Sequence, residues 1–172
     1  ENYKFTYASD QWFRKEIRKW AATKGKDNDG NTKDERWKLA DIYHSQISIV
    51  GRPSAPTSAS NSYTESFYRN SNQYQNFSSQ YNNRKQIVLA GSNGGMLHAF
   101  YSSTGEELWA FIPPSLLSKL RQVESSKSKS SNSIYGVDGS PVVKDIFYNN
   151  KWHTVVITGL GRGGHSYFAL DI

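Results

Sequence analysis

The residues best suited to do chemistry form a short acidic stretch near the start of the chain. Oxygen ligands stand at alternate positions there, with a backbone carbonyl at Lys33 in the series, so that the candidate ligands are Asp27, Asp29, Asn31, Lys33 and Glu35. Calcium is a hard cation that prefers carboxylate, amide and carbonyl oxygens, and this pattern therefore predicts a calcium site. The EF-hand pattern is not met, because Lys38 stands where that loop needs its last glutamate. A plain Asn-Asp-Gly turn also accounts for much of the stretch.

The histidines do not form a close metal-binding pair in the sequence; they are His44, His98, His153 and His165. We interpret His44 as a hydrogen-bonded side chain that supports the turn at Asp41. The glycines at positions 159–164 lack a following Lys-Ser or Lys-Thr and precede a strand, so they are typical of a hairpin and not of a phosphate loop.

No serine stands in a recognisable catalytic frame. Ser45 and Ser140 both occur in turn-like contexts, and the run that begins at Asp138 is typical of a strand entrance, where Pro141 is tolerated. The sequence therefore gives no grounds for an enzyme, and we predict a binding module.

Composition narrows the class of protein further. The 172 residues carry a formal net charge of +6, but the positive side chains are scattered. The cluster at positions 14–19 is interpreted as a solvated helix face, with binding to nucleic acid or an anionic surface as the alternative. No nucleic-acid-binding signature accompanies this charge, so we expect no nucleic-acid partner. The absence of cysteine excludes disulfides and thiolate zinc sites. No apolar run is long enough to span a membrane, and any export signal is expected upstream of Glu1.

The elements that must position these residues are mainly strands. Helical spacing of apolar residues predicts one short helix at Asp10–Thr23, followed by a polar loop at 24–35 that holds the calcium candidate. Strand patterns cover residues 47–50, 86–91, 96–101, 107–112, 141–148, 152–159 and 166–170. Glycine and asparagine turns separate several of them, which predicts an antiparallel meander.

Two polar segments interrupt the strands. Residues 52–84 are rich in Ser, Asn, Gln and Tyr with almost no aliphatic side chains, so we expect a long surface insertion unable to bury a contiguous face. Residues 125–133 are nearly all Ser, Lys and Asn and predict a second surface insertion. The aromatic residues of the first insertion are the candidate binding residues: Tyr63, Phe67, Tyr68, Tyr74, Phe77 and Tyr81.

An internal similarity supports a repeated unit. The run Val88-Leu-Ala-Gly91 leads through glycines to Leu97-His-Ala-Phe100, and Val156-Ile-Thr-Gly159 leads through glycines to Tyr167-Phe-Ala-Leu170. The separation of about 70 residues exceeds the usual propeller blade of roughly 40–50, but the insertion at 125–133 lies inside it. Blades of this kind bury their faces against neighbouring blades, and we expect Trp109 to pack between two of them.

Several motifs carry a resemblance to a known family. The run from Gly91 to Pro113, with its Gly turn, Thr-Gly turn and Trp strand, resembles the repeat of quinoprotein-like propellers. The Trp-Ala-Phe-Ile-Pro-Pro run at 109–114 that closes this repeat resembles more particularly PilC/PilY-type pilus proteins. Val137-Asp-Gly-Ser-Pro141 and Trp37-Lys-Leu-Ala-Asp-Ile-Tyr-His-Ser45 resemble segments of PilC/PilY-type pilus proteins, although Ala40 stands where that family usually has glycine. The chain is therefore similar to part of the C-terminal β-propeller of this family, and the short calcium loop at 27–35 resembles one found in it.

The resemblance implies a mainly β fold made of quinoprotein-like blades, with a short N-terminal helix and long polar loops. It implies a protein secreted by a Gram-negative bacterium to the pilus tip or outer membrane surface, which promotes type IV pilus assembly by opposing retraction and contributes to adhesion and virulence. The implied partners are pilus subunits or minor pilins and a component of the host-cell surface or matrix, with calcium as the ligand of the acidic loop.

Two other functions fit the same repeat. One is a fragment of a quinoprotein dehydrogenase that uses pyrroloquinoline quinone and calcium, and the other is an outer-membrane assembly scaffold with similar blades. Blade repeats do not transmit chemistry, so the repeat alone does not favour the dehydrogenase. Because the last repeat stops within a strand, we expect residues 1–172 to be a fragment of one propeller domain whose remaining blades lie elsewhere.

Overall fold

The computed structural model describes residues 39–58, 63–119 and 135–172. The chain divides into two compact units, Glu1–Ala40 and Asp41–Ile172, and all but two of the described residues belong to the second unit. The helix expected at 10–23, the loop at 24–35 with its calcium candidates and the insertion at 125–133 lie outside the described residues.

The first sheet of the second unit is a four-stranded antiparallel meander. Its strands follow chain order as β1 (Ser48–Val50), β2 (Ile87–Gly91), β3 (Leu97–Tyr101) and β4 (Glu107–Phe111). The turns after β2 and β3 contain Gly95 and Gly105 with φ of 87° and 73°, a left-handed conformation that glycine adopts without steric cost. The pairing of β3 with β4 shifts register between Ala99 and Phe100.

The second sheet contains three antiparallel strands, β5 (Val142–Tyr148), β6 (Lys151–Gly159) and β7 (Tyr167–Asp171). Strands β5 and β6 are joined by Asn149 and Asn150, which both have positive φ as a two-residue hairpin of the favoured type requires. A 3-10 turn at Gly161–Gly163 joins β6 to β7, and the glycines at 159–164 therefore belong to a hairpin as predicted.

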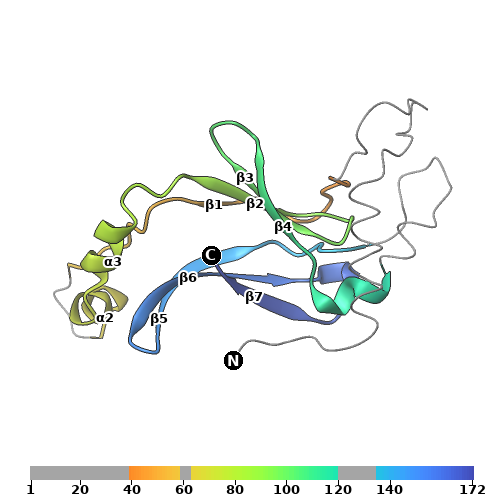
Figure 1. The fold of residues 1–172 in the computed structure, drawn as a ribbon. Coiled ribbons are helices and arrows are strands. Elements are labelled where there is room, and N and C mark those ends of the chain that lie inside the picture. Colours follow the sequence, from red (N-terminus) through yellow and green to blue (C-terminus); the bar gives the residue numbers. More distant parts are fainter. Residues whose placement is uncertain (1–38, 59–62, 120–134) are drawn as a thin grey trace, which may run out of the picture. The chain divides into compact units, whose positions relative to one another are not determined.

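The two sheets face each other across one apolar core (Figure 1). Their first strands, β1 and β5, lie next to each other. The buried members of the core are Val50, Ile87, Leu89, Leu97, Ala99, Leu116, Val137, Val156 and Leu160. Trp109 of β4 packs against this core, as predicted. Two antiparallel sheets that follow each other in the sequence, and whose first strands lie side by side, have the arrangement of adjacent propeller blades.

The strand and turn predictions are confirmed to within one or two residues at each end, because alternating apolar residues and turn glycines are local signals. The first polar insertion differs from its prediction. It contains α2 (Glu65–Ser71) and α3 (Tyr74–Gln80), and α3 buries Tyr74 and Phe77. In the part of the chain that the structure describes, no helix has the length and apolar character needed to cross a membrane.

Candidate functional site

The candidate site is a helical cap, residues 63–81, that covers the β5–β6 hairpin at one end of the second sheet (Figure 1). Helix α2 begins because the side-chain oxygen of Thr64 accepts a hydrogen bond of 3.3 Å from the backbone N–H of Phe67. Glu65 in its first turn and Arg69 in its last turn have the charges that the helix dipole favours.

Aromatic packing attaches the cap to the hairpin. The ring of Trp152 on β6 meets Tyr74 edge to face with centroids 4.8 Å apart, and it also contacts the rings of Tyr68, Phe77 and Phe147. The indole N–H of Trp152 donates a hydrogen bond of 2.7 Å to the carbonyl of Asn72, between the two helices. Aromatic pairs in such geometries stabilise the folded chain by more than the burial of their surface alone would give. The cap is therefore an integral part of the second sheet's packing.

A partly buried polar connection reinforces this attachment. The hydroxyl of Tyr74 donates to the carboxylate of Asp145 on β5 and accepts from the backbone N–H of Ala55 at 3.3 Å. Asp145 also accepts a hydrogen bond of 2.7 Å from the hydroxyl of Thr154, which in turn accepts one of 2.8 Å from Arg84. Burial, and then the hydrogen bond with Asp145, raise the pKa of Tyr74 to about 12, so that its hydroxyl stays protonated and keeps donating.

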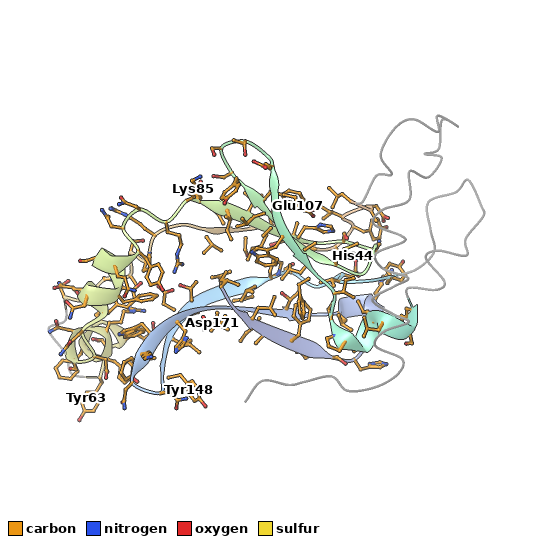
Figure 2. All side chains as sticks on the ribbon, in the orientation of Figure 1. His44, Tyr63, Lys85, Glu107, Tyr148 and Asp171 are labelled. Atoms are coloured by element: carbon orange, nitrogen blue, oxygen red, sulfur yellow. The ribbon has the colours of Figure 1, made fainter. Side chains whose placement is uncertain are left out.

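The six aromatic residues predicted to bind do not share one environment. Tyr74 and Phe77 are only 1% and 8% exposed and pack inward on Trp152. The other four are exposed on the outside of the cap: Tyr63, Phe67, Tyr68 and Tyr81. Tyr63 extends away from the start of α2 (Figure 2). The expectation that this segment buries no contiguous face is wrong, because its aromatic side chains supply the apolar surface that aliphatic residues would otherwise provide.

Two grooves flank the cap, and Arg84 and Thr154 line both of them. The larger, of about 580 Å³, runs between the cap and the edge of the second sheet and is lined by amides, by aromatic rings and by the His153–Asp171 pair. The smaller, of about 390 Å³, lies beside β1 and β5 and is lined by several cationic side chains. The basic groove could not be found from the sequence, because its residues come from five separate segments of the chain.

A second polar network joins the two sheets away from the cap. The ring of His44 bonds the carboxylate of Asp138 at 2.8 Å, and the side chain of Asn93 links Asp41 to Gly136 with bonds of 2.7 and 3.3 Å. His44 is thus hydrogen-bonded as predicted, but its partner is Asp138 and the turn at Asp41 is held by Asn93. Figure 2 shows His44 at the end of the sheets opposite to Tyr63.

A chain of three hydrogen-bonded side chains at the first sheet has the order of a hydrolase triad, with two members buried and the third, Glu107, exposed. Nε2 of His98 accepts a hydrogen bond of 3.0 Å from the Ser92 hydroxyl. Nδ1 of the same ring donates a hydrogen bond of 2.6 Å to the carboxylate of Glu107, since an ionised carboxylate can only accept. Ser92 and His98 are 1% and 0% exposed, so that no substrate reaches the hydroxyl. We interpret the chain as structural, a way to satisfy a histidine inside the sheet. Only the packed fold brings Ser92 and Glu107 to the same ring.

The comparisons with known proteins agree with this geometry. Residues 39–172 match the family model described as the PilY1 beta-propeller domain. The chain belongs to the PilY1 β-propeller family. It is 36% identical over 149 residues to a type IV pilus biogenesis factor PilY1 of Pseudomonas aeruginosa, and 38% identical over 136 residues to a PilY1 homolog of Xylella fastidiosa. These matches cover 87% and 78% of this chain.

A solved structure supports the blade assignment. The crystal structure of the Pseudomonas aeruginosa PilY1 C-terminal domain is similar to 72% of this chain, with a TM-score of 0.53 and 36% sequence identity. The expected mainly β fold, part of a β-propeller, is thereby confirmed. This chain spans 22% of that solved chain and 12% and 10% of the two named relatives, so it corresponds to a small section of a PilY1 protein.

The network around His44 explains why PilY1-like motifs stand so far apart in the sequence. The segment that ends at Ser45 and the segment that begins at Val137 are the entrances to β1 and β5. They are joined by the His44–Asp138 bond and by a bond of 3.0 Å from the backbone N–H of Gln46 to the Ser140 hydroxyl. The two motifs therefore fasten one blade to the next. Among the described residues, no three metal-ligating side chains gather as a metal site would need.

Proposed function

We propose that this chain is a section of a non-enzymatic, cell-surface PilY1-type protein that acts in type IV pilus biogenesis in a Gram-negative bacterium. The observation that carries the proposal is the family match over residues 39–172, together with relatives named as type IV pilus biogenesis factors. The blades supply a rigid frame, and the helical cap is fixed on that frame by Tyr74 and Phe77.

The finer part of the proposal assigns recognition to the outside of the cap. Exposed aromatic side chains on a rigid support are the residues that protein interfaces favour. The cap presents four of them while two others anchor it from inside. We propose that this surface contacts pilus subunits, minor pilins or a component of the host surface, and that the contact supports pilus assembly against retraction and adhesion at the pilus tip or outer membrane.

Complementation tests the surface directly. A strain that lacks its full-length protein would receive a version with the exposed residues Phe67 and Tyr81 changed to Ser, and surface pili and adhering cells would be counted separately. We expect a clear loss of at least one of the two. The matched control is Tyr167→Ser, which removes an aromatic ring that is 81% exposed on β7, outside the cap. Normal pili and adhesion, or an equal loss in the control, would remove the cap's role.

A separate proposal concerns calcium at Asp27–Glu35. The alternating oxygen ligands and the resemblance to the family's calcium loop support it. Calorimetry would compare the full chain with Asp29→Ala, which removes a proposed ligand, and with Asp34→Ala, which removes a neighbouring carboxylate outside the alternating set. We expect the heat of calcium binding to disappear in Asp29→Ala and to persist in Asp34→Ala. Heat unchanged by Asp29→Ala would reject the site.

A further inference from the structure

The basic groove beside β1 and β5 has a size and a lining suited to a ligand. Its volume of about 390 Å³ falls within the roughly 300–1,000 Å³ of sites that bind small groups. The end of β1 and the extended segment after it form one side, and residues of β5 form the other. The groove is distinct from the exposed aromatic face of the cap.

The lining of the groove is strongly cationic. Among the residues that the structure describes, the lining contains Arg52, Arg69, Arg84 and Lys144 and a single carboxylate, that of Asp145. The carboxylate of Asp145 already accepts hydrogen bonds from the hydroxyls of Tyr74 and Thr154. Because four cations face one carboxylate, the groove presents a positive field that Asp145 does not cancel.

Two of the cations have only neutral partners among the described residues. Arg52 donates a hydrogen bond of 2.9 Å to the side-chain oxygen of Asn82, and Arg84 donates one of 2.8 Å to the Thr154 hydroxyl. A guanidinium carries several N–H donors in a planar fork that matches a carboxylate. Both arginines thus keep donors for an incoming anion.

The chain itself provides a carboxylate at the rim. Glu65 of α2 pairs with Arg69 and with Lys144, the latter at 2.9 Å, and the hydrogen bond and charge of Lys144 lower the pKa of Glu65. Two of the four cations of the groove therefore already hold a carboxylate in the folded chain. An external carboxylate would meet the same chemistry and would compete with Glu65.

The rest of the lining shows which class of anion fits best. Ile49 is 60% exposed and lines the groove with Val143 and Ala55, so that apolar surface lies beside the positive charges. A sulfated sugar has no aliphatic side chains to pack on this surface, whereas a peptide with alternating acidic and apolar side chains matches both the charges and the apolar surface. We propose that the basic groove binds an acidic, partly apolar polypeptide segment of a partner protein, with Glu65 as a built-in competitor.

A binding measurement on the full chain tests this proposal. The probe is a fluorescent peptide of alternating Glu and Val, compared with the same peptide carrying Gln in place of Glu and with heparin. We expect Arg52→Gln with Arg84→Gln to weaken binding of the acidic peptide about tenfold or more, and Glu65→Gln to strengthen it about threefold, since tenfold corresponds to the roughly 1.4 kcal/mol of one good charged contact. The matched control, Lys85→Gln, removes an exposed cation that follows Arg84 in the sequence and does not line the groove.

The outcomes separate the alternatives. Arg52 is exposed, so Arg52→Gln alone keeps the test valid if loss of Arg84 impairs folding. No binding of the acidic peptide at millimolar concentration, equal binding of the Gln peptide, or an equal loss with Lys85→Gln would overturn the proposal. Tight binding of heparin with no binding of the peptide would also overturn it, in favour of a sulfated glycan. If the cap variants complement normally, the proposed role of the cap is lost, but the peptide-binding result for the groove still stands.

Discussion

Replacing Tyr74 with Phe probes how the cap is held, because it deletes one hydroxyl and keeps the ring. That hydroxyl donates to the charged group of Asp145 and accepts from the backbone of Ala55. A hydrogen bond to a charged group contributes about 1.5–3 kcal/mol, so we expect Tyr74→Phe to lower the free energy of unfolding by about 2 kcal/mol. Tyr74→Ala also removes the ring from Trp152, and we expect a loss of about 4 kcal/mol.

Urea denaturation of the full chain measures these losses, and hydrogen exchange of residues 74–81 localises them to the cap. Tyr148→Phe is the matched control, since Tyr148 is 64% exposed on β5 and should change stability by less than about 0.5 kcal/mol. A Tyr74→Phe variant as stable as the wild type would refute the polar connection. Equal losses in Tyr74→Phe and Tyr74→Ala would refute the packing on Trp152.

The same residue gives a pH dependence with a defined sign. The pKa of Tyr74 is raised from 10.0 to about 12 in the folded chain. Its contribution to stability is therefore fully present below pH 10 and is lost as the pH rises through about 12. We expect the advantage of the wild type over Tyr74→Phe to shrink between these two pH values. An advantage that stays constant over that range would contradict the raised pKa.

Three further substitutions test the packing between and within the sheets by changes in the free energy of unfolding. Gly139→Ala should destabilise by about 2 kcal/mol or more, because its Cβ would lie 2.2 Å from the carbonyl oxygen of Gly159, and unchanged stability would refute that close approach. Thr158→Val should stabilise by about 1 kcal/mol, since the buried Thr158 hydroxyl has no hydrogen-bond partner among the described residues, and a loss would show that this hydroxyl has one. Ser92→Ala should cost about 1–2 kcal/mol by leaving Nε2 of His98 unpaired, and no loss would contradict its structural role.

The sheets could be predicted from the sequence because their signals are local. Alternation of apolar residues marks the strands, and Gly95, Gly105 and the Asn149-Asn150 pair mark turns whose backbone needs positive φ. These signals do not depend on which other segment packs against the strand. That independence explains why the observed strand ends fall so near the predicted ones.

The cap could not be predicted from the same signals. Its helices are seven residues each, too short for periodicity to indicate them, and its buried face consists of Tyr74 and Phe77 among polar residues. Their burial depends on Trp152, which lies far away in the sequence. The polar composition of the segment therefore favoured an open loop, whereas in the folded chain the segment packs against the aromatic side chains of the β5–β6 hairpin.

Only part of the candidate site could be predicted, because burial again depends on partners that are distant in the sequence. The aromatic residues of the cap were identified by composition, but composition cannot separate the anchors Tyr74 and Phe77 from the exposed Phe67 and Tyr81. The basic groove needs the spatial meeting of Arg52 with Lys144, which are separated by most of the chain. Neighbouring charges in the sequence gave no indication of it.

Site-specific photo-crosslinking can show directly whether the helical cap contacts a partner protein. A photoreactive phenylalanine analogue would replace Phe67 on the cap, or Tyr167 on β7 as the control, in the full-length protein on piliated cells. We expect crosslinks to a pilus subunit or to a host-surface protein from position 67 and not from position 167. The same products from both positions, or no product from position 67, would contradict a recognition role for the cap.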